Sequence, residues 1–171
     1  MRWMAGLTAL VMLAGCASTP VEPLPVVASV DLERYLGIWH EVASLPNRFQ
    51  SGCVADTQAE YRRVDGAIEV RNRCRRADGQ FESVTGVAKV VPDSGNAKLR
   101  VSFFRPFYGN YWVLALDPDY RWALVGEPGR RFGWVLSRTP VLPAADLEAA
   151  LARAAALGYD RGAFRLSPPQ P

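Results

Sequence analysis

Histidine is almost absent from this sequence of 171 residues, in which His40 is the single example. A metal site built from several histidines is therefore excluded, and a Ser-His-Asp triad would have to use His40. The sequence has no Gly-x-Ser-x-Gly motif to present a nucleophilic serine, and strand alternation turns His40 outward. Residues 126–129 lack the lysine and the spacing of a phosphate-binding loop. We expect a protein that is not an enzyme and that holds no metal and no cofactor.

The sequence also lacks a strong excess of either charge. Lys and Arg number 20 and Asp and Glu number 17, which gives a formal net charge of +3 at pH 7. This charge is too small to favour nucleic acid as a partner. Hydrophobic residues make up 49% of the chain and charged residues 22%, proportions that are typical of a globular protein. We therefore expect one folded domain that binds no nucleic acid.

No apolar run is long enough for a permanent transmembrane helix, which needs about 20 residues. The N-terminal run spans Trp3–Leu13, follows Arg2 and precedes small residues and Cys16. This pattern resembles a bacterial lipoprotein signal, in which residues 1–15 are removed and Cys16 becomes the lipidated first residue. Ala17, rather than Asp, resembles lipoproteins that are sorted to the outer membrane. The alternative is an ordinary secretory signal followed by a coincidental cysteine.

Prolines at positions 20, 23 and 25 interrupt the stretch after Cys16. No apolar period accompanies them, and this composition favours extended polyproline-like backbone over packed structure. We expect residues 16–30 to form a flexible tether and residues 31–171 to form the folded domain.

Short runs of β-forming residues, separated by turn residues, favour an all-β sandwich or barrel. Asp65-Gly66 is typical of a two-residue hairpin turn, and the helix formers of residues 144–157 predict one helix near the end. The eight expected strands cover Ile38–Ser44, Thr57–Arg63, Ala67–Arg73, Phe81–Val90, Lys98–Phe103, Tyr111–Leu116, Trp122–Val125 and Phe132–Arg138.

Three short motifs resemble those of the lipocalin family in sequence and position. Gly-Ile-Trp at 37–39 opens the first strand, as the family's Gly-x-Trp does, and Arg138 ends the eighth. Asp-Tyr at 119–120 lies where the family has Thr-Asp-Tyr, although Pro118 replaces the threonine. The stretches 35–43, 101–109 and 136–140 resemble the bacterial outer-membrane lipocalins. The resemblance covers residues 31–166 and implies an eight-stranded antiparallel up-and-down β-barrel with one C-terminal helix packed outside.

In such a barrel the three motifs meet at one end, which we expect to be closed. Trp39 can plug this end while the Arg138 guanidinium stacks over the indole ring, in a cation–π contact that partial desolvation strengthens. The closed-end motif comprises Gly37, Trp39, Asp119, Tyr120 and Arg138.

Cys53 and Cys74 are expected to form a disulfide. The loop after the first strand and the end of the third strand both reach the open end of an up-and-down barrel, and an exported protein enters an oxidising compartment. The alternative is a pair of free, buried thiols.

The inner wall of the barrel is expected to hold an acyl chain, because apolar side chains alternate along the strands. Glu41 on this face needs a partner, for which an inward tyrosine, an arginine, a lipid headgroup or a structural hydrogen bond would each serve. The alternative is that the same side chains pack a filled core. The expected ligand-binding residues are Glu41, Ala43, Tyr61, Val70, Val101, Phe103, Tyr111, Val113 and Trp134.

The loops at the open end carry arginines interleaved with aromatic residues, and this rim is expected to hold an anionic headgroup. Ordinary solvated loop arginines are the alternative. The rim comprises Arg48, Phe49, Arg105, Phe107, Tyr108, Arg130 and Arg131.

The resemblance implies noncatalytic binding, transport or storage of fatty acids or lysophospholipids by a protein anchored to the outer membrane and facing the periplasm. The alternatives are a periplasmic protein-binding or inhibitor barrel and, with less support, a lipocalin-like enzyme. A homodimer is one possible partner arrangement, and the sequence does not decide between a monomer and a dimer.

Overall fold

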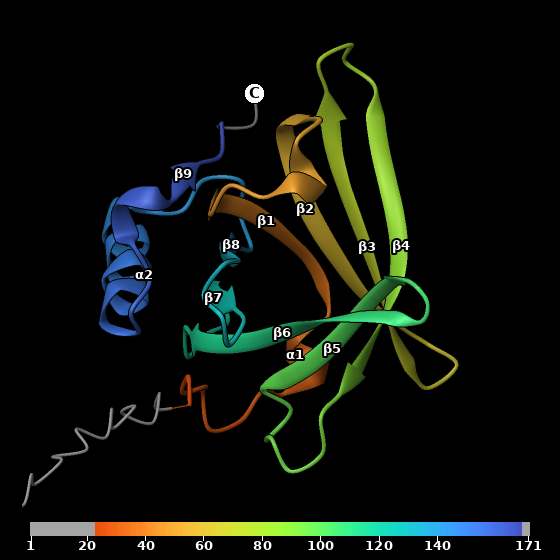
Figure 1. Cartoon of the computed structure of the whole chain (residues 1–171), viewed down its shortest axis with the longest axis vertical. Helices are drawn as coiled ribbons and strands as arrows, with labels where there is room; N and C mark the ends of the chain where they lie inside the picture. The colour runs from red at the N-terminus through yellow and green to blue at the C-terminus, as the bar shows by residue number, and fades with distance from the viewer. Residues whose placement is uncertain (1–22, 169–171) are drawn as a thin grey trace, which may run out of the picture.

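The computed structural model describes residues 23–168, and each of the eight expected runs overlaps a strand (Figure 1). The strands are β1 (Gly37–Ser44), β2 (Cys53–Val64), β3 (Ala67–Arg76), β4 (Phe81–Val90), β5 (Lys98–Phe104), β6 (Phe107–Leu116), β7 (Trp122–Gly126), β8 (Gly133–Ser137) and a short β9 (Arg165–Leu166). The helices are α1 (Leu32–Tyr35) and α2 (Ala144–Ala156), with 3-10 turns η1 (Arg48–Gln50) and η2 (Arg161–Ala163). No helix within this part of the chain is long and apolar enough to cross a membrane.

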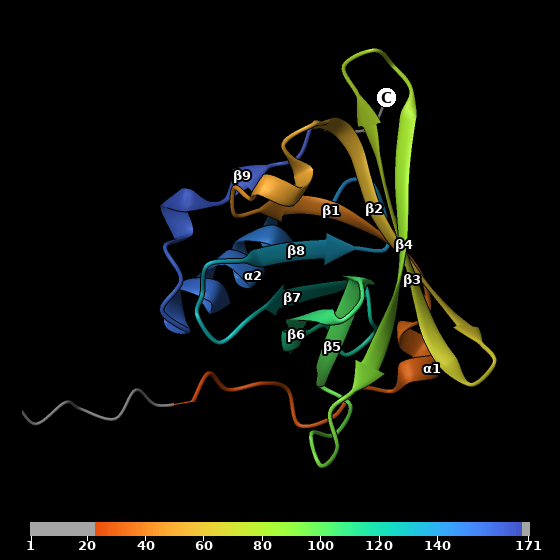
Figure 2. The same ribbon diagram turned by 45° about the vertical axis from the view of Figure 1, so that its right-hand side comes forward.

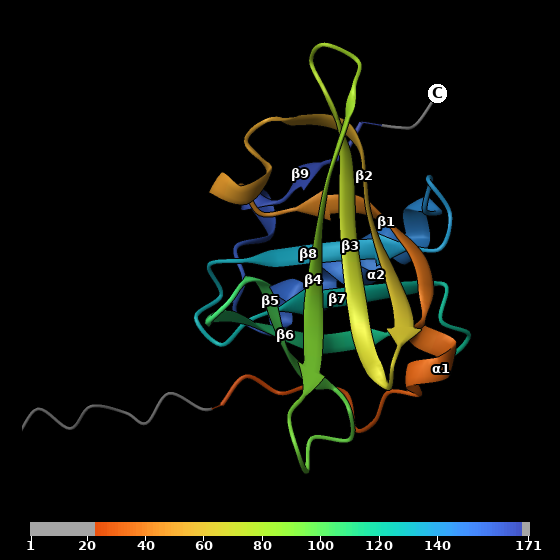
Figure 3. The same cartoon turned by 90° about the vertical axis from the view of Figure 1, so that its right-hand side faces the viewer.

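The strands form one antiparallel sheet that closes on itself as a barrel. Each of β2 to β7 pairs with the next strand along the chain, β8 pairs with β1, and β1 pairs with β2. Figure 3 shows β2, β3 and β4 standing upright while β6, β7 and β8 cross behind them. The sheet therefore has the up-and-down topology expected from the sequence.

The barrel wall has a seam between β1 and β2. Pairing of these strands runs from Gly37↔Tyr61 to His40↔Gln58. Further along β1, Ala43 and Ser44 pair with β8 on one edge and with β9 on the other. Because β8 occupies the first edge, β9 takes the edge that β2 has left.

Buried side chains form two clusters, one inside the barrel around Trp39 and one between the sheet and α2. Helix α2 lies outside the barrel beside β7 and β8 (Figure 2). Its Ala150 and Ala154 are fully buried there. The expectation that Ala43 lines the barrel is wrong, because the pairing register shifts between Glu41 and Ala43 and places Ala43 in the cluster under α2.

The expected tether is not free along its whole length. Leu24 and Val30 are buried, and the backbone N–H groups of Val27 and Val30 donate hydrogen bonds to the carbonyls of Val113 and Gly95. Apolar side chains between the prolines thus pack on the barrel, and the expectation of a flexible tether is wrong from Leu24 to Val30. The expected signal peptide and Cys16 lie outside the described residues.

Candidate functional site

Arg138 and Trp39 close one end of the barrel. The Arg138 Cζ lies 3.9 Å from the centroid of the fully buried Trp39 ring. Its Nη1 donates hydrogen bonds to the carbonyls of Leu36 at 2.9 Å and Ile38 at 3.1 Å. The Trp39 indole N–H donates to the carbonyl of Tyr35 at 2.8 Å. The guanidinium thereby joins the end of α1 to the start of β1 over the plug.

Two other motif residues support this end through the backbone. Gly37 has a φ of +93°, in the region that favours glycine, and a Cβ built there would lie 3.4 Å from Arg138 Nη1. The Tyr120 hydroxyl accepts a hydrogen bond from the N–H of Asp31 at 2.9 Å. Asp119 lies in the adjacent turn with its side chain exposed.

The sequence analysis missed Asp117, which organises the turn between β6 and β7. Its buried carboxylate accepts hydrogen bonds from the backbone N–H groups of Asp119 and Arg121 and from the Arg121 guanidinium. Burial acts to raise the pKa of Asp117, but these hydrogen bonds outweigh it and the pKa is lowered. The signal in the sequence was Asp117-Pro118, a pair that favours turn initiation.

Three tyrosines form the floor of the barrel above the Trp39 plug. The Tyr111 hydroxyl lies 2.8 Å from the hydroxyls of both Tyr35 and Tyr61. Burial raises the pKa of all three, and the neighbouring tyrosines raise that of Tyr111 further. The hydroxyls are therefore protonated at neutral pH and satisfy one another inside an apolar barrel.

The other expected lining residues also belong to the inner cluster. Val70 and Val113 are fully buried in it, while Val101, Phe103 and Trp134 pack against it partly buried. The end near Trp39 is thus packed, with a remaining void of only about 10 Å³ beside Tyr61 and Tyr111. An acyl chain would have to occupy the part of the barrel nearer the open end.

The Cys53–Cys74 disulfide is confirmed, with the two Cα atoms 5.5 Å apart. It joins the start of β2 to β3 at the open end. Next to it, the Arg75 guanidinium pairs with the buried carboxylate of Asp56. The disulfide and this ion pair both link β3 to the part of β2 that borders the seam.

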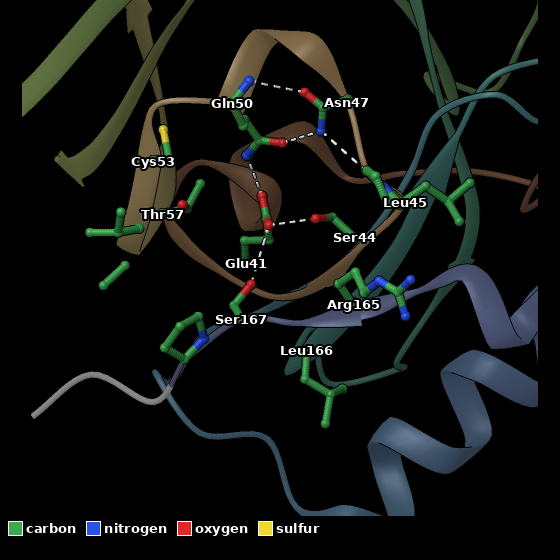
Figure 4. A pocket seen from close by; sticks show the side chains of 14 residues that line it. Glu41, Ser44, Leu45, Asn47, Gln50, Cys53, Thr57, Arg165, Leu166 and Ser167 are labelled. Atoms are coloured by element: carbon green, nitrogen blue, oxygen red, sulfur yellow. Dashed lines mark hydrogen bonds between the residues drawn. The ribbon is translucent and has the colours of Figure 1, made fainter. Parts of the chain in front are cut away.

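Glu41 lies at the seam and takes part in a network of neutral hydrogen-bond donors. Its carboxylate accepts hydrogen bonds from Ser44 Oγ at 2.7 Å, from Ser167 Oγ at 3.2 Å and from the Gln50 side-chain amide (Figure 4). The Gln50 side-chain oxygen in turn accepts from the Trp134 indole N–H at 3.2 Å. The sequence analysis missed Gln50, Ser44 and Ser167 as partners, because they come from three separate segments of the chain.

A cavity of about 230 Å³ opens beside Glu41 at the seam. Its walls come from β1, the loop that contains η1, the first residues of β2, and residues 165–168 after α2 (Figure 4). We call this cavity the seam pocket. It is lined by Glu41, Ser44, Leu45, Pro46, Asn47, Gln50, Cys53, Val54, Ala55, Thr57, Arg165, Leu166, Ser167 and Pro168.

Aromatic side chains cluster at the mouth of the barrel. Phe49 is 68% exposed, and its ring centroid lies 5.6 Å from that of Phe132, which stacks on Trp134 at 6.2 Å. The Arg48 guanidinium lies 5.3 Å from the Phe49 ring, and that of Arg131 lies 5.8 Å from the Phe132 ring. On the hairpin between β5 and β6, Arg105 is exposed and Phe107 is 77% exposed.

Two expected rim residues do not face the mouth. Arg130 Nε donates a hydrogen bond to the Leu157 carbonyl at 2.6 Å, so its guanidinium is held at the C-terminal end of α2. Tyr108 lies on the outer wall, where its ring is 5.3 Å from both Lys89 Nζ and Arg100 Cζ. Both expectations are wrong, because the hydrogen bond to Leu157 turns the Arg130 side chain toward α2, and Tyr108 belongs to β6, where it faces outward.

A family model described as a lipocalin-like domain matches residues 30–169. The chain belongs to the lipocalin family. It is similar to "Outer membrane lipoprotein Blc" of Escherichia coli K12, with 40% identity over 94% of this chain and 92% of that protein. It is also similar to "Temperature-induced lipocalin-1" of Arabidopsis thaliana, with 38% identity over 88% of this chain and 85% of that protein. The structure of insecticyanin from Manduca sexta has a TM-score of 0.70 and 24% identity, over 86% of this chain and 85% of insecticyanin, and shows the shared fold.

The chemistry of this lipocalin is that of a binding protein. Within residues 23–168, no three His, Cys, Asp or Glu side chains lie close enough together to hold a metal ion. His40 sits on β1 beside Asp56, and burial lowers the pKa of its imidazole despite the nearby carboxylate. The features that can act on a ligand are the apolar inner wall, the aromatic and basic mouth, and the seam pocket.

Proposed function

We propose that this lipocalin binds single-chain lipids, fatty acids or lysophospholipids, without chemical change, and carries or stores them at the outer membrane. The observation that carries the proposal is an apolar inner wall that leads to a mouth with exposed phenylalanines. Each buried methylene of an acyl chain contributes about 0.8 kcal/mol, whereas the inner wall offers few polar groups to any other ligand.

Arginines at the mouth supply positive charge that complements an anionic lipid headgroup. Arg48 lies beside Phe49, Arg105 lies between the ends of β5 and β6, and Arg131 lies beside Phe132. Guanidinium groups suit phosphate and carboxylate oxygens, and exposed aromatic rings suit the interface between lipid and water. In this proposal the acyl chain enters the barrel and the anionic part of the headgroup remains at the mouth.

The proposed location follows from the N-terminal sequence and from the relatives named as outer membrane lipoproteins. Lipidation at Cys16, after removal of residues 1–15, would anchor the protein with the barrel facing the periplasm. An inhibitor that blocks a protease with its N-terminal segment is less well supported, since residues from Leu24 onward pack on the barrel.

Native mass spectrometry of the protein purified without its signal, followed by lipid extraction, tests the proposal. We expect a co-purified single-chain lipid, or saturable binding when a fatty acid or lysophospholipid is added to delipidated protein. Absence of both, with the barrel folded by circular dichroism, would overturn it. If a neutral apolar probe bound with the same affinity as these lipids, the mouth arginines would have no role in binding.

A further inference from the structure

Glu41 has no cationic partner among the residues that the structure describes. The three groups that donate to its carboxylate, on Ser44, Gln50 and Ser167, are neutral, so they solvate the negative charge without cancelling it. A half-buried charge that lacks a counter-ion is costly to the fold, and a bound cation would lower that cost.

The seam pocket offers the space for such a cation. Arg165 also lines it, but Figure 4 shows the Arg165 guanidinium turned away from the Glu41 carboxylate. A carboxylate has about four acceptor positions, and three hydrogen bonds leave one for a ligand. The volume of about 230 Å³ is below the ~300–1,000 Å³ of a pocket for a drug-sized ligand. The seam pocket can hold a small polar headgroup, but it has no room for an acyl chain in addition.

Gln50 links this carboxylate to the Trp134 side chain. Gln50 bonds to Glu41 on one side and to the Trp134 indole N–H on the other. Phe132 stacks on Trp134, and Phe49 lies against Phe132. These aromatic side chains do not line the seam pocket, so the Glu41 carboxylate is the group in the pocket that would attract an ammonium group.

We propose that the seam pocket is a subsite for the ammonium group of a zwitterionic lysophospholipid headgroup. Glu41 supplies the negative charge, the hydrogen bonds from Ser44, Gln50 and Ser167 hold its carboxylate in place, and the mouth arginines take the phosphate. This inference rests on the proposed lipid binding and deepens it, because it distinguishes ethanolamine and choline headgroups from fatty acids and from headgroups without an ammonium.

Affinities for three probes with the same acyl chain test the subsite: lysophosphatidylethanolamine, lysophosphatidylglycerol and the free fatty acid. Each is titrated below its micelle-forming concentration. We expect the wild type to prefer lysophosphatidylethanolamine to lysophosphatidylglycerol by about tenfold, which corresponds to about 1.4 kcal/mol. Glu41→Gln should remove this preference, because it should lower the affinity for lysophosphatidylethanolamine more than that for lysophosphatidylglycerol.

Ser167→Ala is the matched control, because it removes one hydrogen bond to the carboxylate and keeps its charge. We expect it to retain the headgroup preference. Equal wild-type affinity for the two lysophospholipids, or a Glu41→Gln variant that still prefers the ethanolamine probe, would overturn the ammonium subsite and leave lipid binding standing. Failure of the folded wild type to bind all three probes would overturn the proposed function itself.

Discussion

The Arg138 guanidinium lies 3.9 Å from the Trp39 ring centroid and at the same time donates to backbone carbonyls of the α1–β1 junction. One side chain thus combines a cation–π contact with the hydrogen bonds that fix the chain around the plug. A lysine can supply the charge but neither the planar stack nor the fork of donors.

Arg138→Lys should therefore lower the free energy of unfolding by about 1–2 kcal/mol. Urea denaturation followed by tryptophan fluorescence measures the change. Arg153→Lys, at an exposed position of α2, is the control and should change stability little. Equal stability of the two variants would show that the stacked guanidinium contributes nothing beyond its charge.

Removing the Cys53–Cys74 disulfide, by Cys53→Ala with Cys74→Ala, should cost about 3 kcal/mol for a loop of this length. The sequence separation is 21 residues, and the bridge holds β2 to β3 beside the seam. The reduced wild type and the double variant should unfold at the same urea concentration, below that of the oxidised protein. An oxidised protein no more stable than the double variant would contradict the prediction.

The tyrosine network predicts a loss of stability at alkaline pH. Burial raises the pKa values of Tyr35, Tyr61 and Tyr111 in the folded protein, whereas unfolded tyrosine titrates near pH ~10. Above about pH 10 the unfolded chain therefore binds fewer protons than the folded one, and stability falls as the pH rises. Below that pH the stabilisation is fully present.

Unfolding in urea, measured at neutral pH and above pH ~10, checks this dependence. Tyr111→Phe removes the central hydroxyl of the network and leaves two tyrosines to titrate. It should be less stable than the wild type at neutral pH and should lose less stability on going to alkaline pH. A Tyr111→Phe protein with the same alkaline loss as the wild type would show that the network does not control it.

The sequence was sufficient to predict elements that local patterns determine. The alternation of apolar and polar residues, together with the turn residues, predicted the eight strands. The family motifs predicted that Trp39 and Arg138 meet at one end of the barrel. Asp31, whose side chain accepts from the N–H groups of Glu33 and Arg34, begins the short helix α1, which the analysis of strand patterns overlooked.

Features that depend on tertiary packing could not be predicted in this way. Strict alternation along β1 fails at the register shift after Glu41, which moves Ala43 to the other face. The partners of Glu41 include Ser167, which is 126 residues away and reaches the seam only because β9 pairs with β1. Proline content predicted a free segment where Leu24 and Val30 find apolar surface on the finished barrel.

The arginines near the open end are of two kinds, exposed or hydrogen-bonded to the backbone, and substituting each kind should separate headgroup binding from stability. Arg105 and Arg131 are exposed on mouth loops, whereas Arg130 donates to the Leu157 carbonyl at the end of α2. Arg105→Gln with Arg131→Gln should weaken binding of lysophosphatidylglycerol and flatten its dependence on salt, because screening acts on exposed charges. The free energy of unfolding should change by less than about 0.5 kcal/mol.

Arg130→Gln should behave in the opposite way. Loss of a charged donor at a helix C-terminus should lower the free energy of unfolding by about 0.3–1 kcal/mol, while lysophosphatidylglycerol affinity and its salt dependence stay at wild-type values. Titrations at low and high salt, paired with urea denaturation of the same samples, measure both quantities. If Arg105→Gln with Arg131→Gln keeps wild-type affinity at every salt concentration, the apolar barrel accounts for binding and the mouth arginines are ordinary solvated loop residues.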